Sequence, residues 1–174
     1  MRDSVDQIIE RVQRVLRLDN SVFTEIANDE GALGPAVGVA ALASAIAAIT
    51  GQGNFVGRVV GGAIGAVIGL FIWTAIILAV SKAFGGKANY GQLVRPLGYS
   101  SAPYALAIIP VLGALVGAIW SLIIQIRAVR EVNEVGDGTA IAIVLIPFGI
   151  LFVLGIILVV VAGIALLSLV GASS

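Results

Sequence analysis

The stretch GRVVGGAIGAVIGLFIWTAIILAVS, residues 57–81, decides the fold class of this chain. Apart from Arg58 it holds no charged residue, and it exceeds the ~20 residues that an α-helix needs to cross a hydrocarbon core of ~30 Å. Three further apolar runs cover residues 31–50, 98–126 and 139–170. Between Glu30 and Glu131 there is no Asp or Glu, and the basic residues lie outside the runs or at their ends. The pattern predicts an all-α, polytopic transmembrane helical bundle.

Composition agrees with a location in a membrane. Hydrophobic residues make up 59% of the chain, and its mean hydropathy of +1.10 would leave a soluble domain too few polar side chains to cover its surface. The formal net charge is zero, and no basic block predicts a nucleic-acid partner. Cys and His are both absent, which excludes disulfides, thiolate and imidazole catalysis and the usual zinc sites. We therefore expect no enzyme, no cofactor and no metal.

Residues 1–30 form a charged lead-in with four of the ten basic and seven of the ten acidic residues. Apolar residues recur at helical spacing from Val5 to Leu16, with polar residues on the other face. We expect an N-terminal interfacial amphipathic helix in the headgroup plane; the alternative is a helix packed on the protein's own cytosolic loops. Three arginines would reach lipid phosphates in the first case: Arg11, Arg14 and Arg17. The predicted domains are this cytosolic or interfacial lead-in and a transmembrane domain over residues 31–174.

The distribution of Lys and Arg near the membrane ends predicts the orientation. A cytosolic N-terminus places nine basic residues inside and only Arg58 outside, provided that the run 98–126 returns to its starting side. This run is too short for two full-thickness helices of ~20 residues each. Pro103 and Pro110 supply breaks, because proline removes a helix hydrogen bond and clashes with the preceding turn. We predict a short broken third segment at about residues 99–110 and a fourth at about residues 111–129.

Residues 139–170 pose the opposite problem. A helix of this length rises ~48 Å, more than the bilayer core requires. One long, tilted span is the preferred interpretation and gives about five spans with the C-terminus outside. A split near Pro147 would give six spans with the C-terminus inside.

Four glycines in the second span lie four residues apart: Gly57, Gly61, Gly65 and Gly69. Their three overlapping GxxxG units let another helix approach closely in lipid. We expect this glycine strip to pack within the chain, against the Ala-rich first span. A homodimer seam is the alternative.

A second group of basic residues, Lys82, Lys87 and Arg95, lies between the second and third segments, close to Tyr90 and Tyr99. These side chains are candidates for binding anionic lipid headgroups, at ~1 kcal/mol for each basic residue near such a surface. The alternative is a topology signal combined with an aromatic belt.

A series of motifs begins at Gly98-Tyr99 and continues with Pro103, Pro110, Gly113 and Trp120. In this order they resemble the YIP family of Ypt/Rab-interacting membrane proteins and their prokaryotic relatives, over about residues 20–155. The resemblance implies five spans with a cytosolic N-terminus, and the compact form is similar to the prokaryotic branch. Eukaryotic members are associated with Rab GTPases and vesicle traffic. Leu33-Gly34-Pro35 matches only part of their Asp-Leu-Tyr-Gly-Pro motif, so the resemblance does not extend to Rab binding.

The predicted function is that of a non-catalytic scaffold or adaptor for membrane organisation or trafficking, in the plasma (inner) membrane. Membrane lipids are the expected partners, together with other membrane proteins or a second copy of the chain. The alternative is a small transporter or channel, because proline-broken helices build sites at the membrane midplane. No ionisable residue lies near mid-membrane, where coupled transporters keep one. We expect the polar residues there to form helix-to-helix hydrogen bonds: Ser44, Thr74, Ser121 and Gln125.

Overall fold

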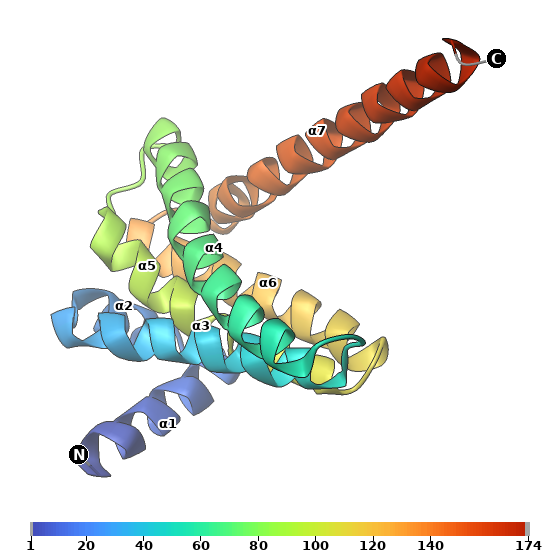
Figure 1. Cartoon of the computed structure of the whole chain (residues 1–174). Helices are drawn as coiled ribbons and strands as arrows, with labels where there is room; N and C mark the ends of the chain where they lie inside the picture. Colours follow the sequence, from blue (N-terminus) through green and yellow to red (C-terminus); the bar gives the residue numbers. More distant parts are fainter. Residues whose placement is uncertain (1, 173–174) are drawn as a thin grey trace. The chain divides into compact units, whose positions relative to one another are not determined.

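The computed structural model describes the backbone of residues 2–172 and the side chains of residues 5–163 (Figure 1). These residues contain seven α-helices and no strand, which confirms the predicted all-α class. The α-helices are α1 (Arg2–Leu16), α2 (Asn20–Asn28), α3 (Leu33–Ala47), α4 (Phe55–Ala83), α5 (Tyr90–Tyr99), α6 (Leu112–Asn133) and α7 (Asp137–Ala172). Three short 3₁₀ helices join them: η1 (Glu30–Ala32), η2 (Ala48–Thr50) and η3 (Ala102–Ile108). The chain divides into two compact units, Met1–Val144 and Leu145–Ser174.

Four stretches within residues 2–163 are long and apolar enough to cross a membrane: Glu30–Thr50, Phe55–Ala83, Leu112–Asn133 and Asp137–Gly163. The short broken segment that the prolines predicted lies between the second and third of these, as α5 followed by η3. Helix α5 begins earlier than predicted, at Tyr90, because Asn89 and Gln92 form a capping box. About five membrane segments therefore agree with the structure.

Residues 139–170 lie in one helix, α7, as the preferred interpretation held. Pro147 falls inside this helix and does not end it. The first compact unit ends three residues before this proline.

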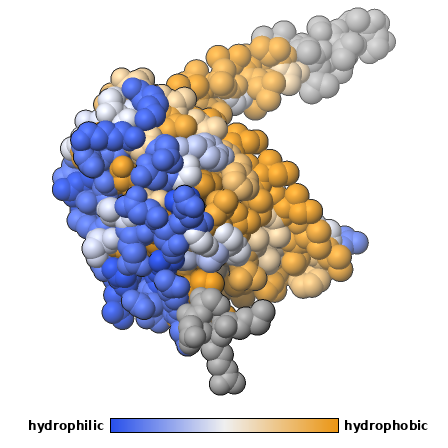
Figure 2. Space-filling view, turned by 90° about the vertical axis from the view of Figure 1, so that its left-hand side faces the viewer, coloured by the Kyte–Doolittle hydropathy of each residue, from blue (hydrophilic) through white to orange (hydrophobic). Residues whose placement is uncertain are grey.

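The first unit has its apolar core at one end, which we call the charged end and define by α1, α2, residues 84–89 and residues 127–137. One cluster joins α2 and the start of α3 to Tyr99 and Ile124. The other joins α5 to the second half of α4 and the start of α7. At the opposite end, the distal end, α3 passes through η2 into α4 and η3 turns into α6. Figure 2 shows hydrophilic residues gathered on one side of the visible face, with apolar residues beside them.

Residues 1–30, set apart as a lead-in by composition, belong to this first unit. Val15 is fully buried against Phe23 and Tyr99, and Val12 packs at the edge of the same cluster. The second half of α1 is thus packed on the protein itself, which was the alternative interpretation. Val5 and Ile9 in the first half remain 54% and 50% exposed.

Candidate functional site

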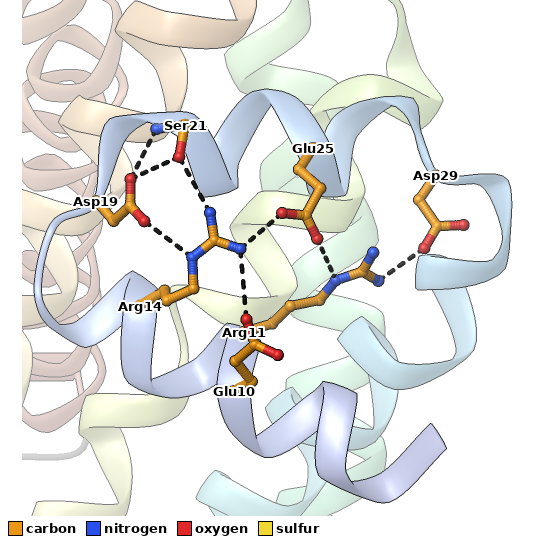
Figure 3. A network of polar contacts seen from close by, with 7 residues as sticks. All are labelled: Glu10, Arg11, Arg14, Asp19, Ser21, Glu25 and Asp29. Atoms are coloured by element: carbon orange, nitrogen blue, oxygen red, sulfur yellow. Dashed lines mark hydrogen bonds and ion pairs between the residues drawn. The ribbon is translucent and has the colours of Figure 1, made fainter. Parts of the chain in front are cut away.

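The most polar site of the first unit is a network of ion pairs that fastens α1 to α2 and to the start of the first span (Figure 3). Arg11 is its buried centre, with a side chain only 7% exposed. Its Nε lies 3.0 Å from Glu25 Oε1, and its Nη1 lies 2.7 Å from Asp29 Oδ2. Because Asp29 immediately precedes η1 and α3, Arg11 ties the amphipathic helix to a membrane span.

Arg14 forms the exposed half of the network, one helical turn further along α1. Its Nε lies 2.8 Å from Asp19 Oδ2, and its Nη1 lies 2.7 Å from Glu25 Oε2. Its Nη2 donates a hydrogen bond of 3.0 Å to Ser21 Oγ. Glu25 therefore accepts from both arginines and bridges them.

The same carboxylates also begin the helices on which they lie. Asp19 is the N-cap of α2 and accepts from the backbone N–H of Ser21 at 3.0 Å. Asp29 caps η1 and accepts from the backbone N–H of Gly31 at 2.9 Å. A capping carboxylate keeps a second oxygen free, and in both cases an arginine of α1 takes it.

The network shifts the ionisation of its members. Burial alone would lower the pKa of Arg11, but hydrogen bonds to Asp29 and Glu25 outweigh it and raise that pKa. Burial would likewise raise the pKa of Glu25, and hydrogen bonds from Arg14 and Arg11 instead hold it below its ordinary value. Hydrogen bonds from Arg14 and Arg11 lower the pKa of Asp19 and Asp29, respectively. All five groups are therefore charged at neutral pH.

Five of the six predicted headgroup ligands thus have partners within the protein. Arg11 and Arg14 are paired with carboxylates, and the burial of Arg11 leaves almost no surface for a phosphate. Arg95 donates from Nη1 to the carbonyl of Ala27 at 2.6 Å, which closes the C-terminus of α2. Lys82 donates to the Gly86 and Lys87 carbonyls, Lys87 pairs with Glu134 at 2.6 Å, and Arg17 is exposed. Headgroup binding by Arg14, Arg17, Lys82, Lys87 or Arg95 stays a prediction.

Three residues of the family-like motif, Gly98, Tyr99 and Trp120, lie beside this network. Tyr99 is fully buried in the same cluster as Val15. A Cβ built on Gly98 would lie 2.7 Å from the Ala36 carbonyl oxygen, so only glycine lets α5 approach α3 this closely. Trp120 Nε1 donates to the carbonyl of Leu16 at 3.1 Å, which closes the last turn of α1.

The other motif residues build the turn between η3 and α6. A Cβ on Gly113 would overlap the carbonyl of Leu106, and one on Gly117 would lie 2.5 Å from the carbonyl of Pro103. At the turn, the N–H of Leu112 donates to the carbonyl of Pro110 at 2.8 Å. Pro110, Gly113 and Gly117, which was not predicted, therefore allow the backbones of η3 and the start of α6 to lie in contact.

A chain of buried hydrogen bonds joins α4, α6 and α5. Trp73 Nε1 donates to Gln125 Oε1 at 2.8 Å, and Gln125 Nε2 donates to Ser121 Oγ at 3.3 Å. Ser121 Oγ donates in turn to the carbonyl of Ser100 at 2.7 Å. Gln125 and Ser121 thus connect helices, in agreement with the role expected for intramembrane polar residues.

The glycine strip of α4 requires a correction within the first unit. A Cβ built on Gly61, Gly65 or Gly69 meets no atom within 4 Å, and one on Gly57 meets only its neighbour Asn54. The contact with the first span is made by Gly62, whose Cβ would lie 3.3 Å from Ser44 Oγ and 3.7 Å from Ala48 Cβ. Successive helix residues are turned by about 100°, so one step from Gly61 to Gly62 changes which face meets α3.

Sequence reasoning missed the partners of Arg11 and the tight position of Gly117. The spacing held a clue to the first, because Arg11 and Arg14 are three apart while Glu25 and Asp29 are four apart. Each pair therefore shares one helix face, and the two faces are opposite in charge. Nothing in the spacing of the glycines distinguishes Gly117 from the strip in α4.

The comparisons with known proteins add one finding. The model of the family described as "Yip1 domain" matches residues 14–161, which include Arg14, all the motif residues and every buried residue of the two core clusters. No curated protein and no solved structure matches the chain.

Proposed function

Because the chain belongs to the Yip1 domain family, we propose that this integral membrane protein is a non-catalytic scaffold that organises membranes through a fixed α1–α2 cap. The cap comprises residues 2–29. Its function is to hold an amphipathic helix in the headgroup region of one leaflet, where the helix contacts lipid and membrane-bound partners.

The observation that carries this proposal is the difference between the two halves of α1. Arg11 and Val15 fix the second half to the bundle, by buried ion pairs and by core packing. Val5 and Ile9, four residues apart on one face of the first half, remain exposed. A helix fixed at one end and apolar on an exposed face at the other is suited to insertion among lipid headgroups.

The test uses the absence of cysteine in the chain. A polarity-sensitive fluorophore is attached to Cys in the Ile9→Cys variant, which is reconstituted in phosphatidylcholine vesicles containing phosphatidylglycerol. We expect the emission of the fluorophore at position 9 to be blue-shifted relative to that of the same fluorophore in water. The matched control is Gln7→Cys, an exposed position that two steps of about 100° place on the other side of α1 from Ile9, where emission should stay that of water. Aqueous emission at both positions would refute insertion.

The buried hydrogen bonds argue for the scaffold over the transporter. Gln125 and Ser121, the polar groups closest to the broken segment, are engaged with α4 and α5. Groups that hold helices together are not available to bind a solute. Reconstituted vesicles should therefore show no ion or solute flux above empty lipid, whereas a saturable flux that Gln125→Leu reduces would establish the transporter.

We also propose that the charged end faces the cytosol of cells in whose plasma membrane the protein resides. The support is the nine-to-one distribution of basic residues, with Arg58 at the distal end. Single cysteines at two exposed positions, Gln52→Cys and Lys87→Cys, test the orientation. An impermeant thiol reagent should label position 52 on intact cells and position 87 only after lysis. The reverse pattern would overturn the orientation.

A further inference from the structure

The turn between η3 and α6, residues 108–112, is apolar throughout. It reads Ile-Ile-Pro-Val-Leu, and no polar side chain lies between Tyr104 and Trp120. Turns that enter water are ordinarily built from polar residues. Four other loops of the first unit follow that rule and each carry a polar or charged side chain: residues 17–19, 51–54, 84–89 and 134–136.

The apolar side chains of this turn are open to the surroundings within the first unit. Val111 is 79% exposed and Leu112 is 70% exposed. The polar loop at residues 51–54 lies at the same end of the unit, because η2 and η3 are in contact. The distal end therefore presents two neighbouring turns of opposite polarity.

The backbone of the apolar turn is closed on itself, as hydrocarbon requires. Within the core of a bilayer there is no water to pair with a free N–H or C=O group. The N–H of Ile109 donates to the carbonyl of Leu106 at 2.9 Å, and the N–H of Leu112 donates to the carbonyl of Pro110 at 2.8 Å. Proline has no N–H to satisfy. From Ile109 to Leu112, at most the N–H of Val111 stays open.

Val111 takes a strained conformation to complete this pairing. Its φ of 63° and ψ of −69° belong to a tight γ-turn, which is rare for a β-branched residue. A turn in water can relax and leave its N–H groups to the solvent. A turn in hydrocarbon cannot, so the strain is expected where lipid surrounds the backbone.

The irregular backbone before the turn is shielded by α6. A Cβ on Gly113 would overlap the carbonyl of Leu106, and one on Gly117 would lie 2.5 Å from the carbonyl of Pro103. Non-helical backbone is tolerated at membrane depth only where protein covers it. The two glycines bring α6 close enough to cover η3.

The length of α6 gives the turn a depth within the bilayer. From Leu112 to Ile126 there are 15 uncharged residues, and Arg127 follows. This stretch rises ~22 Å, whereas the hydrocarbon core is ~30 Å thick. With Arg127 at the boundary of one leaflet, the turn ends inside the core and not beyond it.

We propose that α5–η3 and α6 form a re-entrant hairpin, whose turn at residues 108–112 ends among the acyl chains of the leaflet at the distal end. The partner of this surface is the hydrocarbon of lipid. The hairpin enters and leaves the membrane at the charged end, so Arg95 and Arg127 stay on one side. This inference goes beyond the proposed scaffold role and does not depend on the position of α1.

The test measures the depth of the turn by fluorescence quenching. Val111→Cys in the full chain carries a small fluorophore, and the protein is reconstituted in phosphatidylcholine vesicles. Bromine atoms on the acyl chains should quench this fluorophore strongly. Iodide, present on both sides of the membrane, should quench it several-fold less than a fluorophore at Gln52→Cys in the neighbouring polar loop. Ile109→Cys is a second position in the turn and should behave like position 111, without replacing the strained residue.

Each other outcome overturns the hairpin. Iodide quenching at positions 109 and 111 that equals the quenching at position 52 would place the turn in water. Weak quenching by both bromine and iodide would show that another protein surface, and not lipid, covers the turn. Both results are independent of the fluorophore at position 9, so failure of the hairpin and failure of the α1 insertion are read separately.

Discussion

Replacing Arg11 with Met should loosen the attachment of α1 to α2 and to the start of the first span, because it removes the ion pairs with Glu25 and Asp29 while keeping the aliphatic part of the side chain. Arg11 contacts Glu25 at 3.0 Å and Asp29 at 2.7 Å. In the variant the two carboxylates face an apolar side chain. The helix then keeps the Arg14 ion pairs to Asp19 and Glu25, the packing of Val15 and its neighbours and the bond from Trp120 to Leu16.

The size of the effect follows from the exposure of the partners. Removing one member of a buried ion pair costs about 3–5 kcal/mol when the remaining charge is stranded without water. Here the Glu25 and Asp29 side chains are 40% and 37% exposed and can recover hydration. An exposed pair is worth only about 0.2–1 kcal/mol, but Arg11 itself is buried. We therefore expect a cost between the two limits and nearer the lower one, about 1.4 kcal/mol, which is a tenfold change in the equilibrium for local opening.

The assay measures this opening through a buried thiol. Val15 is fully buried, so Cys in a Val15→Cys variant reacts with a thiol reagent only when α1 opens. Arg11→Met should raise the labelling rate at position 15 about tenfold, by the cost just estimated. Arg17→Met, which removes an exposed charge directly after the same helix, should leave the rate unchanged.

A second thiol tests whether the opening is local. Ile143 is fully buried in the other core cluster, and Ile143→Cys should label at the same slow rate with or without Arg11. Equal rates at position 15 in the Arg11→Met and Arg17→Met proteins would refute the role of the buried ion pairs. A parallel rise at position 143 would show global unfolding instead.

Three further predictions concern stability. Gly117→Leu should strongly lower the melting temperature of the protein in detergent, because a Cβ at this position meets a backbone carbonyl at 2.5 Å and overpacking costs about 1–3 kcal/mol. Gly61→Leu should have little effect, and equal losses would contradict the finding that Gly61 faces away from the other helices of the first unit. Gln125→Leu should lower the free energy of unfolding in detergent by about 1 kcal/mol, because it removes the acceptor for the indole N–H of Trp73 in α4. Gln125→Glu should restore the acceptor in part. An unchanged stability of the Gln125→Leu variant would refute a packing role for Gln125. The pKa values of Glu25 and Asp29 are lowered in the folded protein. Their contribution to holding α1 in place is therefore complete above their ordinary pKa values of 4.5 and 3.8 and is lost as pH falls below them. Pepsin should cleave within α1 faster as pH falls through that range, and a pH-independent rate would contradict the ion-pair attachment.

The class and the number of membrane segments could be predicted from the chain alone because they depend on local composition. Apolar runs of sufficient length specify spans wherever they occur, and the break near Pro103 follows from the missing N–H of proline. The helical period of residues 5–16 likewise predicts an amphipathic helix. The start of α5 at Tyr90 was missed because the capping box at Asn89 lies in a polar segment that reads as a loop.

The candidate site could be predicted only in part. The motif residues Gly98, Tyr99 and Trp120 were identified, but not that Tyr99 and Trp120 meet the second half of α1 and that Gly98 lies against Ala36. The arginines were assigned to lipid phosphates because a linear pattern shows which face is charged and not what lies opposite. Glu25 and Asp29 bind Arg11 in place of lipid phosphates, because the folded backbone of α2 and its C-terminus already holds these carboxylates beside it.

The sequence by itself determined that this chain lies in a membrane, where it turns and which face of its first helix is apolar, since each property is set within one or two helical turns. Only the tertiary structure decided that Arg11 pairs within the protein and that Gly62, not Gly61 or Gly65, meets the first span. A rotation of about 100° per residue separates a packed face from an open one. Which face is packed depends on the angle at which two helices cross, and that angle is a property of the whole bundle.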